Sequence, residues 1–327
     1  MRENGDFRPE AIRLDAEREV EKIGQALRTY LRRDLKRRGL VVALSGGIDS
    51  SVTAALATHA VGPGRVFGVL MPERQSLPAT LPLSRGLAEF LEIDHVVEDI
   101  TSALEGVRCY ERYEAAVRLA VPDYGPGWKS KIVLSPAQGR LSYPLFSVVT
   151  ESPSGETVTA QLRAQAYLEI VAATNFKQRT RKMLEYYHAD RLNYAVSGTP
   201  NRLEYDQGFF VKGGDGLADV KPIAHLYKTQ VYQLAEHLGL PEAIRTQKPS
   251  TDTYSLEQSQ DEFYFGLPHD KMDLCLFGLN QNATPEAVAP AVGMTPEQVE
   301  LVFEDIRRKR NATRPLHLHS LLVPDAT

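Results

Sequence analysis

The first apolar pattern along the chain is helical. Leu14 begins a stretch, ending near Gly39, in which charged residues separate the apolar ones. Within this stretch, the apolar side chains spaced three or four residues apart are Val20, Ile23, Leu27, Leu31 and Leu35. Side chains at this spacing share one face of a helix. The pattern therefore predicts a single amphipathic helix over residues 14–39.

Short apolar runs then alternate with helical patterns. Residues 40–45, 66–71 and 95–100 are apolar runs that predict buried strands, and the spacing within 52–61 and 81–93 predicts helices between them. Strands that alternate with helices are typical of a parallel sheet with right-handed crossovers. The pattern therefore predicts an α/β fold, in which a Rossmann-like parallel sheet is flanked by helices.

A different pattern interrupts this alternation at residues 107–163. Two β-rich runs in this segment flank Pro153-Ser154-Gly155, three residues that favour a turn. Two such runs around a turn are typical of an antiparallel β-hairpin. We expect this hairpin to be an insertion between the two halves of the sheet.

The alternation resumes after the insertion, with predicted helices at 164–189 and 227–239 and a predicted strand at 192–198. A further helix is predicted at 295–310, because Thr295 can cap it and Pro296 can open it. We interpret residues 1–327 as one domain, with the insertion at 107–163 and a helical C-terminal region at 270–327.

The first predicted strand runs into the motif SGGIDSS at residues 45–51. Ligands of open parallel sheets bind beyond the carboxyl ends of the strands. Glycines at such a place let backbone N–H groups approach an anion, and a helix that starts there adds partial positive charge. Ser45, Ser50 and Ser51 add hydroxyl donors, although the motif fits neither the Walker nor the G-x-G-x-x-G pattern. The sequence predicts a phosphate-binding loop, with Asp49 as a ligand for Mg²⁺ beside it.

Composition and charge narrow the functional classes. The formal net charge of -4 provides no overall attraction to nucleic acid. Cys109 and Cys275 are the two cysteines, too few for a disulfide framework or a common four-ligand zinc site, and they suit a reducing compartment. The first residues lack an apolar signal segment, and no stretch is long enough to span a bilayer. We expect a cytoplasmic protein that binds neither membrane nor nucleic acid.

The motif SGGIDS resembles the pyrophosphate loop of the ATP pyrophosphatase superfamily, whose members cleave ATP between its α and β phosphates. Within that superfamily, the segments TNFKQRTRKM, SGTPNRLEYDQGFFVKGGDGLADVKPIAHLYKTQVYQLAEHLGLP and KPSTD are similar to the NAD synthetases. The spacing from Arg179 through Asp219 to Lys228 matches that family without a gap. The resemblance implies an adenine nucleotide α-hydrolase-like fold, and it covers most of the chain outside 107–163 and the C-terminal end.

The resemblance implies a role for each matching residue. Asp49 and Lys228 would be catalytic, and Asp49 and Glu204 would share the Mg²⁺ that bridges the ATP phosphates. The residues implied to bind ATP are Ser45, Gly46, Gly47, Asp49, Ser50, Ser51, Thr199, Lys228 and Ser250. The residues implied to hold deamido-NAD are Arg179, Lys212 and Asp219. By residue type alone, several of these charged residues would be interpreted as solvated surface groups, so their roles depend on the match.

The resemblance also implies a reaction, the ATP- and Mg²⁺-dependent amidation of deamido-NAD with ammonia. The nicotinate carboxylate would attack the α-phosphate of ATP, the co-substrate, to release pyrophosphate and leave an acyl-adenylate. Ammonia would then displace AMP and give NAD. The phosphate loop begins at residue 45, which leaves no room before it for a glutaminase domain. We therefore expect free ammonia, or a separate glutaminase, to supply the nitrogen, and a homodimer, because relatives place the dinucleotide site at a subunit interface.

Two features differ from the family pattern. The family closes with a His-Lys pair that meets deamido-NAD, whereas this chain reads RRKRNATRPLHLH, with Arg314 as the nearest counterpart. The insertion at 107–163 is also longer than the family leads us to expect. Three alternatives stay open: an amide ligase that adenylates another carboxylate, a tRNA-modifying enzyme of the superfamily, and a nucleotide-binding module without activity. The last is disfavoured because binding alone does not require Asp49, Glu204 and Lys228 together.

Overall fold

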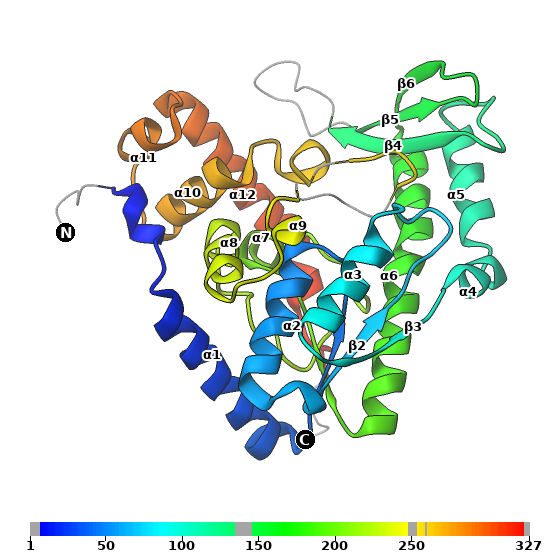
Figure 1. The fold of residues 1–327 in the computed structure, drawn as a ribbon. Helices are drawn as coiled ribbons and strands as arrows, with labels where there is room; N and C mark the ends of the chain where they lie inside the picture. The colour runs from blue at the N-terminus through cyan, green and yellow to red at the C-terminus, as the bar shows by residue number, and fades with distance from the viewer. Residues whose placement is uncertain (1–6, 135–145, 248–253, 259, 324–327) are drawn as a thin grey trace.

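The computed structural model describes residues 7–134, 146–247, 254–258 and 260–323 (Figure 1). Its centre is a 4-stranded parallel sheet with the order β3-β2-β1-β7. The strands are β1 (Leu40–Ala43), β2 (Val66–Leu70), β3 (Asp94–Val97) and β7 (Ala195–Ser197). The chain adds β2 and β3 on one side of β1 and returns to add β7 on the other, which creates a switch point at β1. The predicted α/β fold with a parallel sheet is confirmed.

Helices cover both faces of this sheet. Side chains alternate along a strand, so Val42 and Val41 of β1 point to opposite faces and belong to different apolar clusters. The helices packed on the Val42 side are α1 (Ala16–Thr29), α2 (Ile48–Val61), α3 (Thr80–Phe90) and α8 (Lys228–His237). Those packed on the Val41 side are α4 (Thr101–Gly106), α5 (Cys109–Arg118) and α6 (Ala164–Leu192).

The helix α2 is buried along most of its length. Its sequence is rich in alanine, which lets it pack closely against its neighbours, and Gly62, with a φ of 82°, ends it. Because α2 starts directly after β1, this packing fixes the start of the helix at the carboxyl edge of the sheet. The SGGIDSS motif lies at that start.

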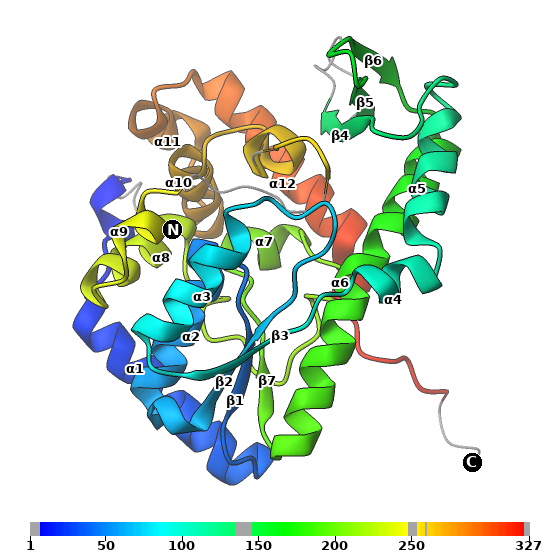
Figure 2. The same cartoon turned by 45° about the vertical axis from the view of Figure 1, so that its right-hand side comes forward.

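The insertion contains more structure than the predicted hairpin. The hairpin itself is confirmed, since β5 (Phe146–Glu151) pairs antiparallel with β6 (Thr157–Gln161). A third strand, β4 (Lys129–Leu134), pairs with the other edge of β5. The prediction of two strands therefore missed one strand of this sheet. The turn residues between β5 and β6 mark that hairpin locally, whereas no short turn joins β4 to β5. Figure 2 shows this second sheet near the end of α6 that lies away from the parallel sheet.

Several predicted boundaries shift. The predicted first helix is divided, because α1 gives way to a π-helical turn at Tyr30–Leu35. The predicted strand at 192–198 shrinks to β7, because α6 continues to Leu192 and Asn193, with a φ of 55°, ends it. The remaining helices are α7 (Arg202–Gln207), α9 (Glu242–Arg245), α10 (His269–Asn280), α11 (Pro285–Val292) and α12 (Pro296–His317).

Three helices, α10 to α12, occupy most of residues 269–317, and the described residues 318–323 after them are not helical. Thr295 caps α12 by accepting a hydrogen bond from the Gln298 N–H at 3.3 Å, although the helix runs beyond the predicted end at residue 310. Within the described ranges, no helix combines the length and the apolar character that crossing a bilayer requires.

Candidate active site

The carboxyl ends of β1, β2 and β7 border a cavity of about 400 Å³. The start of α2 and one face of α6 also line it, and Phe146 of the insertion and Tyr264 complete the wall. This volume lies in the range of small-molecule sites. The cavity therefore lies where the topology and the phosphate-binding motif both predict a ligand.

The loop between β1 and α2 requires glycine at Gly46. The backbone there has a φ of 73°, and a Cβ would lie 3.0 Å from the carbonyl oxygen of Thr80. Gly47 is the N-cap residue of α2 and provides no side-chain cap. The first N–H groups of a helix have no partner within it, so those of α2 are left for an anion in the cavity.

The serines of the loop divide into two groups. Ser45 and Ser50 line the cavity, and their hydroxyl oxygens lie 3.0 Å apart. The hydroxyl of Ser51 instead donates to the Gly47 carbonyl at 2.8 Å, and Ser51 is fully buried. Ser45, Gly47 and Ser50 therefore face the cavity, whereas Ser51 shapes the loop from behind.

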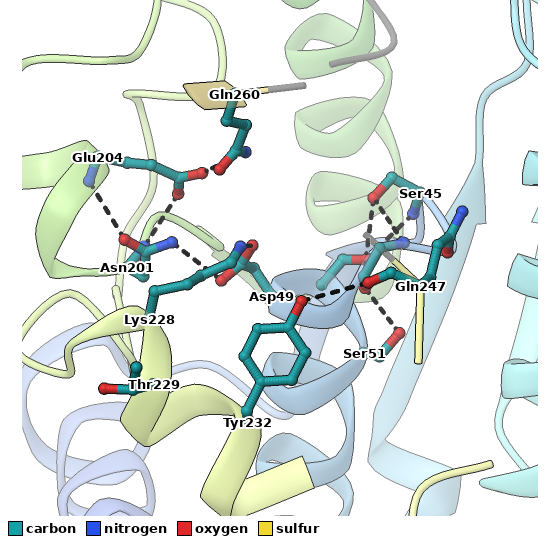
Figure 3. A network of polar contacts seen from close by, with 12 residues as sticks. Ser45, Asp49, Ser51, Asn201, Glu204, Lys228, Thr229, Tyr232, Gln247 and Gln260 are labelled. Atoms are coloured by element: carbon teal, nitrogen blue, oxygen red, sulfur yellow. Dashed lines mark hydrogen bonds and ion pairs between the residues drawn. The ribbon is translucent and has the colours of Figure 1, made fainter. Parts of the chain in front are cut away.

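Asp49, Glu204 and Lys228 come together on one side of the cavity, although they belong to three separate helices (Figure 3). Asp49 lies in the first turn of α2, and the Nζ of Lys228, the first residue of α8, donates to its Oδ2. The lysine side chain is 2% exposed. Asp273 fixes the start of α8, since its carboxylate accepts hydrogen bonds from the N–H groups of Lys228 at 3.1 Å and Thr229 at 2.7 Å.

The charges of this cluster influence each other's protonation. Burial, together with the negative charge of Asp49, raises the pKa of the Glu204 carboxyl to about 8. Burial acts to lower the pKa of Lys228, but the charges of Asp49 and Glu204 outweigh it, and the pKa is raised. Lys228 is therefore a permanent cation within the cavity wall, and Glu204 is a carboxyl group that can take up or release a proton near neutral pH.

Two residues that the sequence analysis missed hold the acids in place. Asn201 donates from its side chain to Asp49 Oδ1 at 3.0 Å and from its backbone N–H to Glu204 Oε2 at 3.1 Å. Gln260 donates to the other oxygen of Glu204 at 2.9 Å. Asn201 could have been found, because N-x-x-E at residues 201–204 is a capping-box pattern before α7. Gln260 lies far away in the sequence and carries no local signal.

The predicted ATP residues beyond the loop differ in their placement. Thr199 lines the cavity at the end of β7. Ser197, two residues earlier, also lines it, and its buried hydroxyl has no hydrogen-bond partner among the described residues. Ser250 lies outside the described residues.

The three residues predicted to hold the second substrate lie outside the cavity lining. Arg179 donates from Nε to the Lys212 carbonyl at 3.3 Å, and Lys212 Nζ donates to the Pro315 carbonyl at 2.9 Å. Arg314, the predicted counterpart of the His-Lys pair, directly precedes Pro315 in α12. Asp219 accepts a hydrogen bond from the Val196 N–H at 2.7 Å. The chain thus brings Arg179, Lys212 and the end of α12 together, apart from the acid–lysine cluster.

The α6 side of the cavity carries a second group of charges that the sequence analysis missed. Lys182 and Glu185 form a buried ion pair of 2.6 Å, and Asp215 is a further, partly buried acid in this wall. Burial raises the pKa of both Glu185 and Asp215. A Lys–Glu pair three residues apart usually indicates an exposed helix surface, so the sequence could not assign this pair to a cavity.

Comparison with known proteins identifies the family. The model of the family described as NAD synthase matches residues 19–119 and 147–314. The NH(3)-dependent NAD(+) synthetase of Rhizobium rhizogenes is 55% identical over 314 residues, which cover 96% of this chain and 95% of the relative. The chain belongs to the NAD synthase family. Residues 120–146, which fall within the insertion, lie outside the family match.

Solved structures resemble the fold of this family member. The NMN synthetase of Francisella tularensis has a TM-score of 0.61 and 22% identity, covering 97% of this chain and 99% of that one. The NH3-dependent NAD synthetase of Campylobacter jejuni has a TM-score of 0.61 and 20% identity, with coverages of 95% and 100%. At these identities the likeness concerns the fold, and it spans both chains almost completely.

Proposed function

We propose that the chain is an ammonia-dependent NAD synthetase, which converts deamido-NAD, ATP and ammonia to NAD, AMP and pyrophosphate. The observation that carries this proposal is the cluster of Asp49, Glu204 and Lys228 beside the phosphate loop in a member of this family. The high identity to a relative of that name along almost the whole chain supports the choice of substrate.

The residues around the cavity suit a reaction in two steps. In the first, a carboxylate oxygen of deamido-NAD bonds to the α-phosphorus of ATP, and the bond to the bridging oxygen of the β-phosphate breaks. The released pyrophosphate carries the charge that the helix start and the Lys228 ammonium are placed to stabilise. In the second, ammonia bonds to the acyl carbon, loses a proton, and displaces AMP. The scheme needs no protein nucleophile, so the chain must position the reactants and exclude water from the adenylate.

We further propose that Asp49 and Glu204 hold Mg²⁺. The fit is chemical: both are carboxylates, both bond to Asn201, and both line the cavity beside the phosphate loop. Mg²⁺ in nucleotide sites is bound by one or two carboxylates together with substrate phosphates. When bound, the ion neutralises phosphate charge and orients the triphosphate.

This metal assignment predicts proton release. A group with a pKa of about 8 is mostly protonated at pH 7.5, and it must ionise to bind a cation. Binding of Mg²⁺ with a nonhydrolysable ATP analogue should therefore release a proton from Glu204, and the number of protons released per site should fall as the pH is raised above about 8. Calorimetry in two buffers of different ionisation enthalpy measures this number. The Glu204→Gln variant is the control, and equal proton release in both proteins would remove Glu204 from the metal site.

The second substrate is proposed to lie against Arg179, Lys212 and Asp219. These residues lie outside the cavity lining, which supports a homodimer in which a second copy completes the site. Free ammonia or a separate glutaminase would supply the nitrogen. We place the reaction in the cytoplasm, a reducing compartment suited to the free thiols of Cys109 and Cys275, and we treat residues 1–327 as one working domain.

The proposed function is tested by offering different carboxylates to the protein with ATP, Mg²⁺ and ammonium, while AMP and pyrophosphate are measured. The panel includes deamido-NAD and the shorter nicotinate mononucleotide, because one structural neighbour is an NMN synthetase. We expect stoichiometric AMP, pyrophosphate and NAD with deamido-NAD. Turnover with another acid and none with deamido-NAD would reject NAD synthesis but keep the adenylation chemistry.

A further inference from the structure

A second cavity, of about 600 Å³, lies at the opposite edge of the parallel sheet from the phosphate loop. Three of its lining residues show its position in the fold. Arg38 lies just before β1, Arg65 just before β2, and Tyr194 just before β7. It is therefore lined at the amino ends of the strands, whereas the candidate active site lies at their carboxyl ends. Its other lining residues are Arg28, Arg32, Arg37, Val61 and Gly64.

Five arginines and no carboxylate line this cavity. Three of the arginines are held by nearby groups. Arg65 donates from Nε to the Arg38 carbonyl at 2.5 Å, and Arg37 donates to the side-chain oxygen of Asn193 at 3.3 Å. Arg28 pairs with Glu21 at 2.6 Å. These contacts orient part of the cavity wall.

The other two arginines, Arg32 and Arg38, are exposed, and their guanidinium groups have no hydrogen bond or ion pair with any described residue. The ends of α1 and α2 explain part of the cluster, because helix C-termini favour cations and Arg28 donates to the Ala60 carbonyl of α2 at 3.4 Å. That explanation does not extend to Arg32 and Arg38. Like charges gathered without counter-charges repel one another unless an anion binds between them.

We propose that this arginine cavity is a binding site for a small molecule with a diphosphate or triphosphate group, separate from the catalytic site. Guanidinium groups donate paired hydrogen bonds that match phosphate oxygens. The volume is in the range of nucleotide-sized ligands, and Tyr194 and Val61 add an aromatic and an apolar surface to the wall. The concave shape favours such a small ligand over a membrane surface. The inference does not depend on the proposed function.

The test is calorimetric titration of the full chain with inorganic pyrophosphate and with ADP, in a buffer of low ionic strength. Both probes are also expected to bind at the phosphate loop, so the titrations are fitted to two sites, and the variants below assign one of the two to the arginine cavity. The variant Arg32→Ala/Arg38→Ala removes the two unpaired cations. The matched control Arg18→Ala/Arg33→Ala removes two exposed arginines from the same part of the chain, outside the cavity lining. Both variants remove two positive charges. A difference in affinity between them therefore comes from contacts within the cavity and not from the long-range electrostatic field of the protein.

We expect the affinity of the arginine cavity for both probes to fall about tenfold or more in Arg32→Ala/Arg38→Ala and to stay within about twofold of wild type in the control. Direct contacts with phosphate contribute more binding free energy than the screened attraction of distant charges. If Arg32→Ala/Arg38→Ala loses affinity for both probes, the phosphates are the recognised group. If it loses affinity for ADP alone, the site recognises the nucleotide. The thermal unfolding temperature should be unchanged in both variants, which verifies that they fold. Equal weakening in the two variants, or binding that neither changes, would overturn the proposal.

Discussion

Replacing Asp49 by asparagine is expected to lower the rate of AMP formation by roughly 10³-fold, since it removes an anionic ligand of the Mg²⁺ proposed to neutralise the reacting phosphates. Asparagine keeps the size of the side chain, and its oxygen can still accept the hydrogen bond that Asn201 donates at 3.0 Å. The loop and the start of α2 should therefore keep their shape. What is lost is the counter-charge of Lys228 and one proposed ligand of Mg²⁺.

Pyrophosphate release with saturating ATP, Mg²⁺, ammonium and deamido-NAD measures this effect. Asp94→Asn is the control, because Asp94 is an exposed acid of β3 outside the cavity lining. That variant should keep the wild-type rate. Full activity in Asp49→Asn would remove Asp49 from the catalytic site and would leave the acid–lysine cluster as a structural feature.

The parallel sheet could be predicted because its signals are local. Each strand is a short apolar run, and each crossover helix has its own spacing, so the order of β1, α2 and β2 follows from the residues that form them. The third strand of the insertion could not be predicted in the same way. Its pairing with β5 depends on a contact between two segments that no short turn joins, and sequence pattern does not record such a contact.

The residues of the candidate site differ in the same way, because some have a local sequence signal and others depend on contacts between distant segments. The position of the SGGIDSS loop at the cavity could be predicted, since its glycines and serines are contiguous and directly follow a strand. Glu204 and Lys228 were assigned through the family resemblance, and the fold brings both to Asp49. Gln260 and the Lys182–Glu185 pair were missed, because a glutamine and an ion pair on a helix usually lie at the surface, and only tertiary packing brings them to the cavity.

Like Asp49→Asn, replacing Lys228 by methionine should have a large effect on catalysis, a loss of roughly 10²- to 10³-fold in the rate of adenylation. Methionine fills a similar volume but leaves no cation among Asp49, Glu204 and the incoming phosphates. The same change should lower the free energy of unfolding by about 3 kcal/mol, because it breaks a buried ion pair and leaves the acids unpaired. The pKa of Glu204 should rise further, since the Lys228 charge now acts to lower it.

A second buried lysine separates these two effects. Lys177 pairs with Glu73 at 2.7 Å, and both side chains are buried outside the cavity lining. Lys177→Met should therefore cost a similar unfolding free energy, measured by chemical denaturation, while the pyrophosphate rate of the folded protein stays near wild type. If both lysine variants lose the same fraction of the rate, Lys228 acts through stability alone.

If Lys228→Met loses the rate and Asp49→Asn/Lys228→Met loses little more, the two residues act as one unit on the triphosphate, as non-additivity within a catalytic group requires.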